Sequence, residues 1–173
     1  MLPIVLDPQK VKAASIGVGP AFTRRVAQLA SAGVSEPLVF EAGRDALPDA
    51  QALSGCGVVF IAGLQEDQAR PLYEAAHEAG ALVNTEDMRA LCDFHMPAVV
   101  RRGDLLLTAS TGGKSPGLAR QLRKMLEQQF GPEWESILED VATARQSWLD
   151  EGLSFSEVAK RTETYIEQNG WLA

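Results

Sequence analysis

The sequence contains few of the residues that build metal centres and disulfide frameworks. Among 173 residues there are two cysteines and two histidines. Cys56 and Cys92 lie far apart and outside any Cys-x-x-Cys motif, so we expect packed thiols rather than a zinc site or a disulfide. His77 and His95 are isolated from each other; we expect the first at the surface and the second in a packed environment. No metal site is predicted.

Long apolar runs and an excess of positive charge are also missing. No apolar stretch approaches the roughly 20 residues that a membrane span needs, and the first residues do not resemble a secretory signal. The chain has 23 acidic and 16 basic residues, for a net charge of −7, which disfavours nucleic acid as a partner. We therefore expect a water-soluble, cytoplasmic protein with neither a membrane nor a nucleic-acid partner.

The first informative pattern is a strand that runs into a glycine turn and a helix. The small apolar run 13–16 predicts a strand, Gly17-Val18-Gly19 predicts a turn, and Gly33 ends the helix that follows. The helix is amphipathic. Its apolar face is expected to carry Phe22, Val26, Leu29 and Ala30, and its polar face Arg24, Arg25 and Gln28.

An acidic residue follows the next predicted strand, which spans 37–40. In a dinucleotide-binding fold, one glycine forms the turn and a second lets the backbone approach the pyrophosphate. An acid about 20 residues further on binds the ribose hydroxyls. Gly17, Gly19 and Glu41 fit these roles, whereas Phe22 stands where that fold has a small residue. A plain strand-turn-helix connection remains the alternative.

Strands and helices then alternate up to residue 96. Apolar runs predict strands at 58–61 and 81–84, and a helix is expected over 66–79 with its inner face on Leu72, Ala75, Ala76 and Ala79. This alternation favours a parallel, doubly wound sheet, whose ligands bind at the carboxyl ends of the strands. The residues expected there are Gly17, Val18, Gly19, Pro20, Ala21, Glu41, Gly63 and the segment Asn84 to Asp87.

Asp87 is a candidate general base, because it lies just beyond the last of these strands. A solvated surface carboxylate is the alternative.

A second glycine junction follows a predicted antiparallel hairpin that turns at 102–104. Ser110, Thr111, Gly112, Gly113, Lys114 and Ser115 join its second strand to a helix, with Ser115 as N-cap and Pro116 in the first helical turn. Backbone amides, the helix dipole and Lys114 favour an anion such as phosphate or carboxylate. A Walker A loop would need glycine at Thr108. A glycine turn that merely caps the helix is the alternative.

The last part of the chain predicts two amphipathic helices. Gly131-Pro132 interrupts the preceding helix, and Ser154 to Glu157 forms a capping box before the final one. Aromatic residues on these helices are expected to pack in the core or against another subunit rather than to stack on a ligand.

With these residues in place, the chain resembles the precorrin-2 dehydrogenase and sirohydrochlorin ferrochelatase family, the amino-terminal module of siroheme synthase. The resemblance extends from Leu2 to about Phe130. The matching elements are Leu2-Pro3-Ile4, the glycine turn with Arg24-Arg25, Asn84-Thr85-Glu86-Asp87, Met96-Pro97 and, most specifically, Ser110 to Arg120.

The resemblance implies a three-part organisation and an activity. It implies a Rossmann-like NAD-binding domain at 1–96, a small α+β dimerisation segment at 97–130 and a helical domain at 131–173. The implied reaction is NAD-dependent oxidation of precorrin-2 to sirohydrochlorin by a homodimer. In bifunctional members, ferrous ion insertion (a lyase activity) follows and gives siroheme.

The resemblance also assigns roles to residues. Asp87 matches the catalytic aspartate, and the Ser110 to Ser115 loop, together with Asn84, is expected to bind the tetrapyrrole carboxylates. Departures cluster in the cofactor region, at Val18, Phe22 and Gly63. The alternatives are therefore a ferrochelatase or a non-catalytic tetrapyrrole-binding or regulatory protein with a degenerate NAD site.

Overall fold

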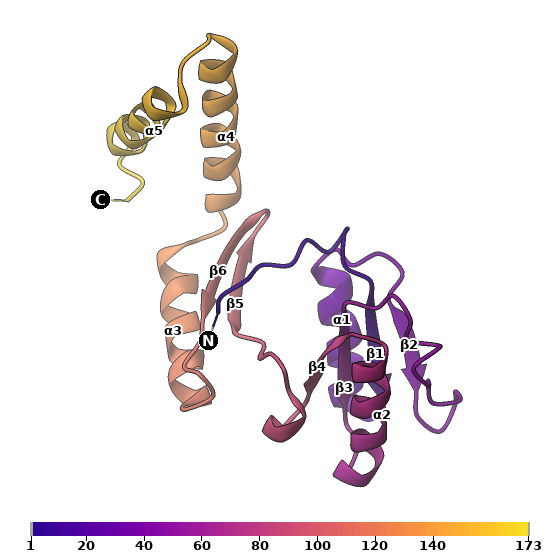
Figure 1. The fold of residues 1–173 in the computed structure, drawn as a ribbon. Helices are drawn as coiled ribbons and strands as arrows, with labels where there is room; N and C mark the ends of the chain where they lie inside the picture. Colours follow the sequence, from indigo (N-terminus) through magenta and orange to yellow (C-terminus); the bar gives the residue numbers. More distant parts are fainter. Residues whose placement is uncertain (1, 173) are drawn as a thin grey trace. The chain divides into compact units, whose positions relative to one another are not determined.

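The computed structural model describes residues 2–172 and divides into two units, Met1–Met96 and Pro97–Ala173 (Figure 1). The first unit contains the parallel sheet and the second contains a hairpin and three helices. Within 2–172, no helix combines the length and the apolar character needed to cross a membrane. The expected boundary between a dimerisation segment at 97–130 and a helical domain at 131–173 stays a prediction.

The first unit has the predicted alternation of strands and helices. Its elements are β1 (Ala13–Gly17), α1 (Gly19–Ser31), β2 (Leu38–Glu41), β3 (Val58–Ala62), α2 (Glu66–Glu78), β4 (Leu82–Thr85) and the short 3-10 helix η1 (Arg89–Leu91). All pairings in the sheet are parallel, in the order β2-β1-β3-β4. The predicted doubly wound architecture is therefore confirmed.

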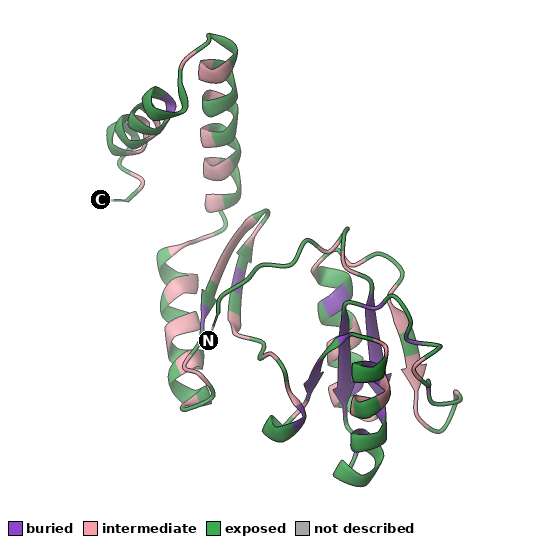
Figure 2. Ribbon diagram, viewed as in Figure 1, coloured by how far each residue is buried: buried purple, intermediate pink, exposed green. Residues whose placement is uncertain are grey.

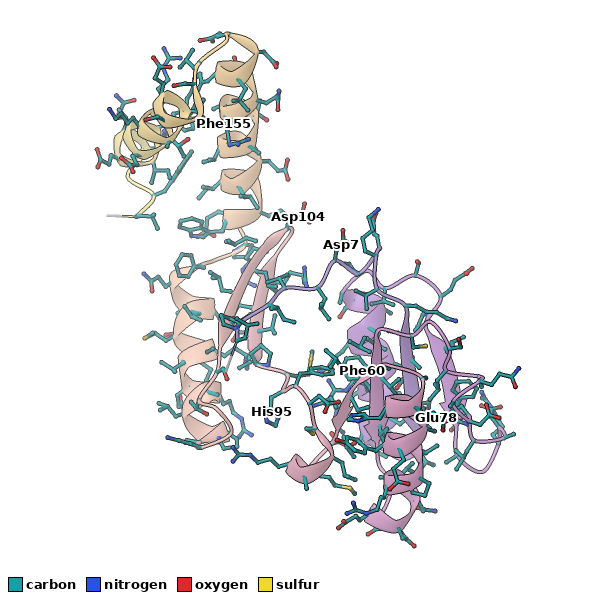
Figure 3. The ribbon with its side chains drawn as sticks, in the orientation of Figure 1. Asp7, Phe60, Glu78, His95, Asp104 and Phe155 are labelled. Carbon is teal, nitrogen blue, oxygen red and sulfur yellow. The ribbon has the colours of Figure 1, made fainter. Side chains whose placement is uncertain are left out.

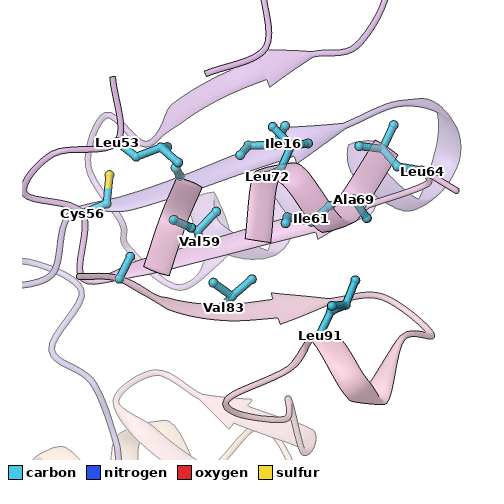
Figure 4. Packing of buried hydrophobic residues seen from close by; sticks show 13 residues of the cluster. Ile16, Leu53, Cys56, Val59, Ile61, Leu64, Ala69, Leu72, Val83 and Leu91 are labelled. Carbon is cyan, nitrogen blue, oxygen red and sulfur yellow. The ribbon is translucent and has the colours of Figure 1, made fainter. Parts of the chain in front are cut away.

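The two faces of this sheet pack against different helices. Every residue of β1 and β3 is buried (Figure 2). Alternate residues of a strand point to opposite faces of the sheet, so both faces are covered. One face packs on α2 and forms the larger core cluster, drawn in Figure 4 with Ile16, Ile61 and Leu72. The other face packs on α1, where Leu29 meets Val58.

The helix α1 differs from its predicted faces at two positions. Ala30 is exposed, although it was expected in the apolar face. Arg25 was expected on the polar face but is half-buried, with its guanidinium 5.0 Å from the centroid of the Phe60 ring. An arginine can do this because its long apolar stem and planar head group pack against an aromatic surface.

The second unit consists of a two-stranded hairpin and three helices, with few buried side chains. They are β5 (Ala98–Arg102), β6 (Leu105–Ala109), α3 (Pro116–Gln129), α4 (Trp134–Asp150) and α5 (Phe155–Asn169). The antiparallel hairpin, the Ser115 N-cap and the Ser154–Glu157 capping box are all confirmed. Aromatic rings join the last two helices, where Tyr165 contacts both Trp148 and Trp171 edge to face.

Helix α3 leaves part of its apolar face uncovered. Leu118 and Met125 are 53% and 52% exposed, whereas Leu122 and Leu126 are half-buried. Helical spacing places these four residues in one stripe, but only half of the stripe is covered within the unit.

Candidate functional site

The β1–α1 turn and the end of β3 are in direct backbone contact. The Val18 amide donates to the Ala62 carbonyl at 3.1 Å. A Cβ atom on Gly17 would lie 1.9 Å from that same carbonyl oxygen, and one on Gly63 would lie 2.0 Å from the Val18 carbonyl oxygen. Only glycine fits at either position, so these two glycines let the turn and the neighbouring strand end interlock.

The space next to Gly19, at the amino-terminal end of α1, is open. Gly19 begins the helix with a φ of +72°, and no atom lies within 4 Å of where its Cβ would be. The N-cap Val18 provides no side-chain hydrogen bond, and Pro20 occupies the first turn. The positive end of the α1 dipole thus has no side-chain cap, which is the arrangement that favours a bound phosphate.

Glu41 lies beside this turn. It pairs with Gly17 across β1 and β2, and the next amide, that of Ala42, donates to the Gly17 carbonyl at 2.8 Å. The structure therefore brings together the predicted residues 17–21, Glu41 and Gly63 at the carboxyl edge of the sheet. Phe22, which stands where a dinucleotide-binding fold has a small residue, is buried within this unit, with 6% of its surface exposed.

A short polar loop orients the Glu41 carboxylate, and the sequence analysis did not identify it. Arg44 Nη1 lies 3.0 Å from Glu41 Oε2, and Arg44 Nη2 lies 3.3 Å from Asp45 Oδ2. Asp45 Oδ2 also accepts the Glu41 amide hydrogen at 2.8 Å. This backbone hydrogen bond, together with Arg44, lowers the pKa of Asp45. The i to i+3 spacing of Glu41 and Arg44 is the signal that could have revealed the pair.

Asn84 lies near the end of β4, and both its amide nitrogen and its amide oxygen form hydrogen bonds within the first unit. It is 7% exposed. Its Nδ2 donates to the Phe94 carbonyl at 2.9 Å, and its Oδ1 accepts from Arg25 Nη2 at 3.4 Å. Burial lowers the pKa of the Arg25 guanidinium, with Glu86 acting in the opposite direction. The observed contacts of Asn84 connect β4, α1 and the segment after η1.

Asp87 occupies an exposed turn immediately after β4. Its φ is +59°, an uncommon conformation for a residue with a side chain. Backbone outliers of this kind concentrate at functional sites. The catalytic role of Asp87 stays a prediction.

The second glycine loop closes on itself through a hydroxyl group. Thr111 Oγ1 donates to the Ser115 carbonyl at 3.0 Å and accepts from the Ser115 amide at 3.2 Å. Gly112 and Gly113 both have positive φ values, +64° and +75°. The Gly112 amide donates to Ser110 Oγ at 3.3 Å. Thr111 thus holds the loop shape at the amino-terminal end of α3.

Lys114 is exposed in this loop and forms no ion pair among residues 2–172. Its ammonium group is therefore available to an anion beside the amino-terminal end of α3.

Neither histidine belongs to a group that could hold a metal ion. His77 is exposed, as expected, and its Nε2 lies 2.8 Å from Asp93 Oδ2. His95 is exposed rather than packed (Figure 3). Over the described part of the chain, three or more His, Cys, Asp or Glu side chains gather nowhere in metal-binding geometry.

Two family profiles match consecutive parts of the chain. A profile described as putative NAD(P)-binding matches residues 4–98, and one described as the central domain of a sirohaem biosynthesis protein matches residues 102–129. The first of these covers more than half of the chain and contains every residue of the β1–α1 turn, Glu41, Gly63 and Asp87.

Siroheme synthases from several bacteria are similar in sequence. That of Nitrosococcus oceani is 33% identical over 141 residues, 73% of this chain and 30% of the relative. That of Azotobacter vinelandii is 34% identical over 159 residues, 79% of this chain and 33% of the relative. This chain thus spans about a third of the length of such relatives. Among solved structures, SirC, a precorrin-2 dehydrogenase, is 17% identical and superimposes with a TM-score of 0.75, covering 100% of this chain and 93% of SirC.

The interlocked glycines can be tested by paired alanine substitutions. Gly63→Ala places a methyl group against the Val18 carbonyl and should lower the free energy of unfolding by roughly 3 kcal/mol or more. Gly80→Ala is the matched control, because Gly80 also has a positive φ, +81°, but no neighbour within 4 Å. Gly80→Ala should lower the free energy of unfolding by about 1 kcal/mol. Urea denaturation measures both, and equal losses would contradict the close contact.

Proposed function

We propose that this protein catalyses the NAD-dependent oxidation of precorrin-2 to sirohydrochlorin. The chain belongs to the putative NAD(P)-binding family, and siroheme synthases are among its relatives. The observation that carries this proposal is the β1–α1 turn. Gly17 and Gly63 let the turn interlock with β3, while the start of α1 stays open at Gly19. A connection that served only to join a strand to a helix would require neither feature.

The residues of the turn fit a dinucleotide. Residues 17–21 would hold the pyrophosphate at the amino-terminal end of α1, and Gly63 keeps the neighbouring strand end clear of a side chain. Glu41 would bind the ribose hydroxyls. Its negative charge disfavours a 2′-phosphate, which supports NAD over NADP as the cofactor. When bound, NAD supplies the acceptor for a hydride from the substrate.

Asp87 is the proposed general base. Its exposed carboxylate follows β4 at the same edge of the sheet as the β1–α1 turn. Loss of a hydride and a proton together removes two hydrogens from precorrin-2, and Asp87 would accept the proton. The left-handed backbone at Asp87 supports a functional rather than a merely surface role.

The Ser110 to Ser115 loop is proposed to bind carboxylates of the tetrapyrrole. Ser110 and Thr111 set its shape, and Lys114 provides the charge. Precorrin-2 carries many carboxylates, so one cation and a helix amino terminus suit part of its periphery.

Three further expectations belong to this proposal. A homodimer is supported by the uncovered Leu118 and Met125 on α3, because a second copy could bury them. Insertion of ferrous ion, as a substrate, into sirohydrochlorin rests on the family resemblance, as does the lyase activity. The cytoplasm is the expected compartment.

Substitution of Asp87 tests the proposed reaction. Asp87→Asn removes the base but keeps a side chain that tolerates a positive φ, so the protein should fold and bind NAD normally. Its turnover of precorrin-2, followed as NADH absorbance, should fall by at least about 100-fold. Glu86→Gln, at the adjacent position, is the control and should keep most of the activity. Full turnover by Asp87→Asn would rule out Asp87 as the base.

Substitution of Lys114 tests the substrate loop. Lys114→Ala should raise the KM for precorrin-2 about tenfold, the effect of losing one charge-assisted contact, and leave kcat and the NAD affinity unchanged. Lys124→Ala removes another exposed lysine, on α3, and should change neither constant. Equal KM values for the two variants would show that Lys114 does not contact the substrate.

A further inference from the structure

The turn that carries Asp87 is joined to β3 at its start and closed by a hydrogen bond of its own. Thr85 ends β4, and the Met88 amide donates to the Thr85 carbonyl at 3.3 Å to close the turn. The Glu86 amide donates to the Ile61 carbonyl of β3 at 2.9 Å. Asp87 itself has a φ of +59°. Aspartate tolerates this left-handed conformation, so the exact shape of the turn depends on the groups that hold its two ends.

The outer edge of β4 is covered by the segment after η1, through an isolated antiparallel bridge between Asn84 and Cys92 and through side chains. β4 is the last strand of the sheet, so every second amide points away from β3. The Val83 amide donates to Asp93 Oδ2 at 2.7 Å, and the Thr85 amide donates to Cys92 Sγ at 3.2 Å. Two consecutive residues thus cover the two outward amides of this edge.

Cys92 contacts both ends of the Asp87 turn. Its Sγ lies 3.1 Å from the Thr85 carbonyl oxygen and 3.3 Å from that of Met88, so its single proton can be donated to either. The same sulfur accepts from the Thr85 amide and, at 3.7 Å, from Asn84 Nδ2. The thiol therefore bridges the first and last residues of the turn.

The position of Cys92 is itself fixed from both sides. Before it, η1 inserts Leu91 into the main core, where it is 2% exposed (Figure 4). After it, the Asp93 amide donates to the Val83 carbonyl at 2.8 Å. Burial raises the pKa of the Cys92 thiol, so the group is protonated at neutral pH and acts as a donor.

We propose that Cys92 is a positioning residue that holds the Thr85–Met88 turn and so fixes the backbone of Asp87. This inference rests on the proposed function, because the kinetic consequence requires Asp87 to be the base. The thiol does not touch the substrate. Its effect on the reaction comes from fixing the turn and so the position of the Asp87 carboxylate.

Removal of the thiol should slow the chemical step without weakening cofactor binding. Cys92→Ala should lower kcat about tenfold or more and leave the Kd for NAD within about twofold, because a displaced base costs rate rather than NAD affinity. Cys92→Val keeps the site filled with apolar atoms, removes the donor and acceptor, and suits the extended backbone at this position, with φ −131° and ψ 124°. It should behave as Cys92→Ala does. Cys92→Ser keeps a donor and an acceptor and should regain at least half of the lost activity.

Asp93→Ala is the matched control, since Asp93 closes the same strand edge at Val83, away from the turn. Both substitutions should speed amide hydrogen exchange locally, at Thr85 and Met88 for Cys92→Ala and at Val83 for Asp93→Ala. Only the Cys92 variants should lower kcat. An unchanged kcat in Cys92→Ala and Cys92→Val, or an equal loss in Asp93→Ala, would overturn the proposal.

Hydrogen exchange separates this inference from the proposed function. If the wild-type protein does not oxidise precorrin-2, the proposed function fails. Faster exchange at Thr85 and Met88 in Cys92→Val would then still establish that the thiol holds the turn, and unchanged exchange at both amides would refute it.

Discussion

The backbone contact between the β1–α1 turn and the end of β3 holds together the two strand ends at the centre of the carboxyl edge. Gly17 and Gly63 permit the contact because a Cβ atom at either position would collide with a carbonyl oxygen. Glu41 pairs with Gly17, and the turn after β4 is joined to β3 by the hydrogen bond from the Glu86 amide and contacted at both ends by Cys92. The proposed cofactor site and the candidate base thus share one edge of one sheet, and substitution at either glycine would disturb the proposed cofactor site.

Much of this edge can be predicted from the sequence, because its causes are local. Continuous apolar runs identify the buried strands, since a residue of a parallel sheet is covered on both faces. Glycines at strand ends identify the turns, and Glu41 lies about 20 residues beyond the first turn, where an acid that binds ribose is expected. The cap at Ser115 and the capping box at Ser154 are equally local, and both form as predicted.

The features that the sequence analysis missed depend on contacts between distant segments. Helical periodicity puts Arg25 on a polar face, yet its side chain lies over Phe60 and reaches Asn84, 59 positions away. Nothing local reveals that Cys92 covers the edge of β4, because the contact depends on how η1 packs into the core. Periodicity likewise predicts the apolar stripe of α3 but not which part of it the unit leaves uncovered.

Binding of NAD at the β1–α1 turn can be measured by calorimetric titration of NAD into the wild-type protein and into Gly19→Asp. Aspartate tolerates the φ of +72° at Gly19, and its Cβ meets no atom within 4 Å, so the variant should fold while placing a negative charge where the pyrophosphate would bind. We expect micromolar binding to the wild-type protein and none to the variant. Absence of binding to the folded wild-type protein, or equal binding to both, would contradict binding of NAD at this turn.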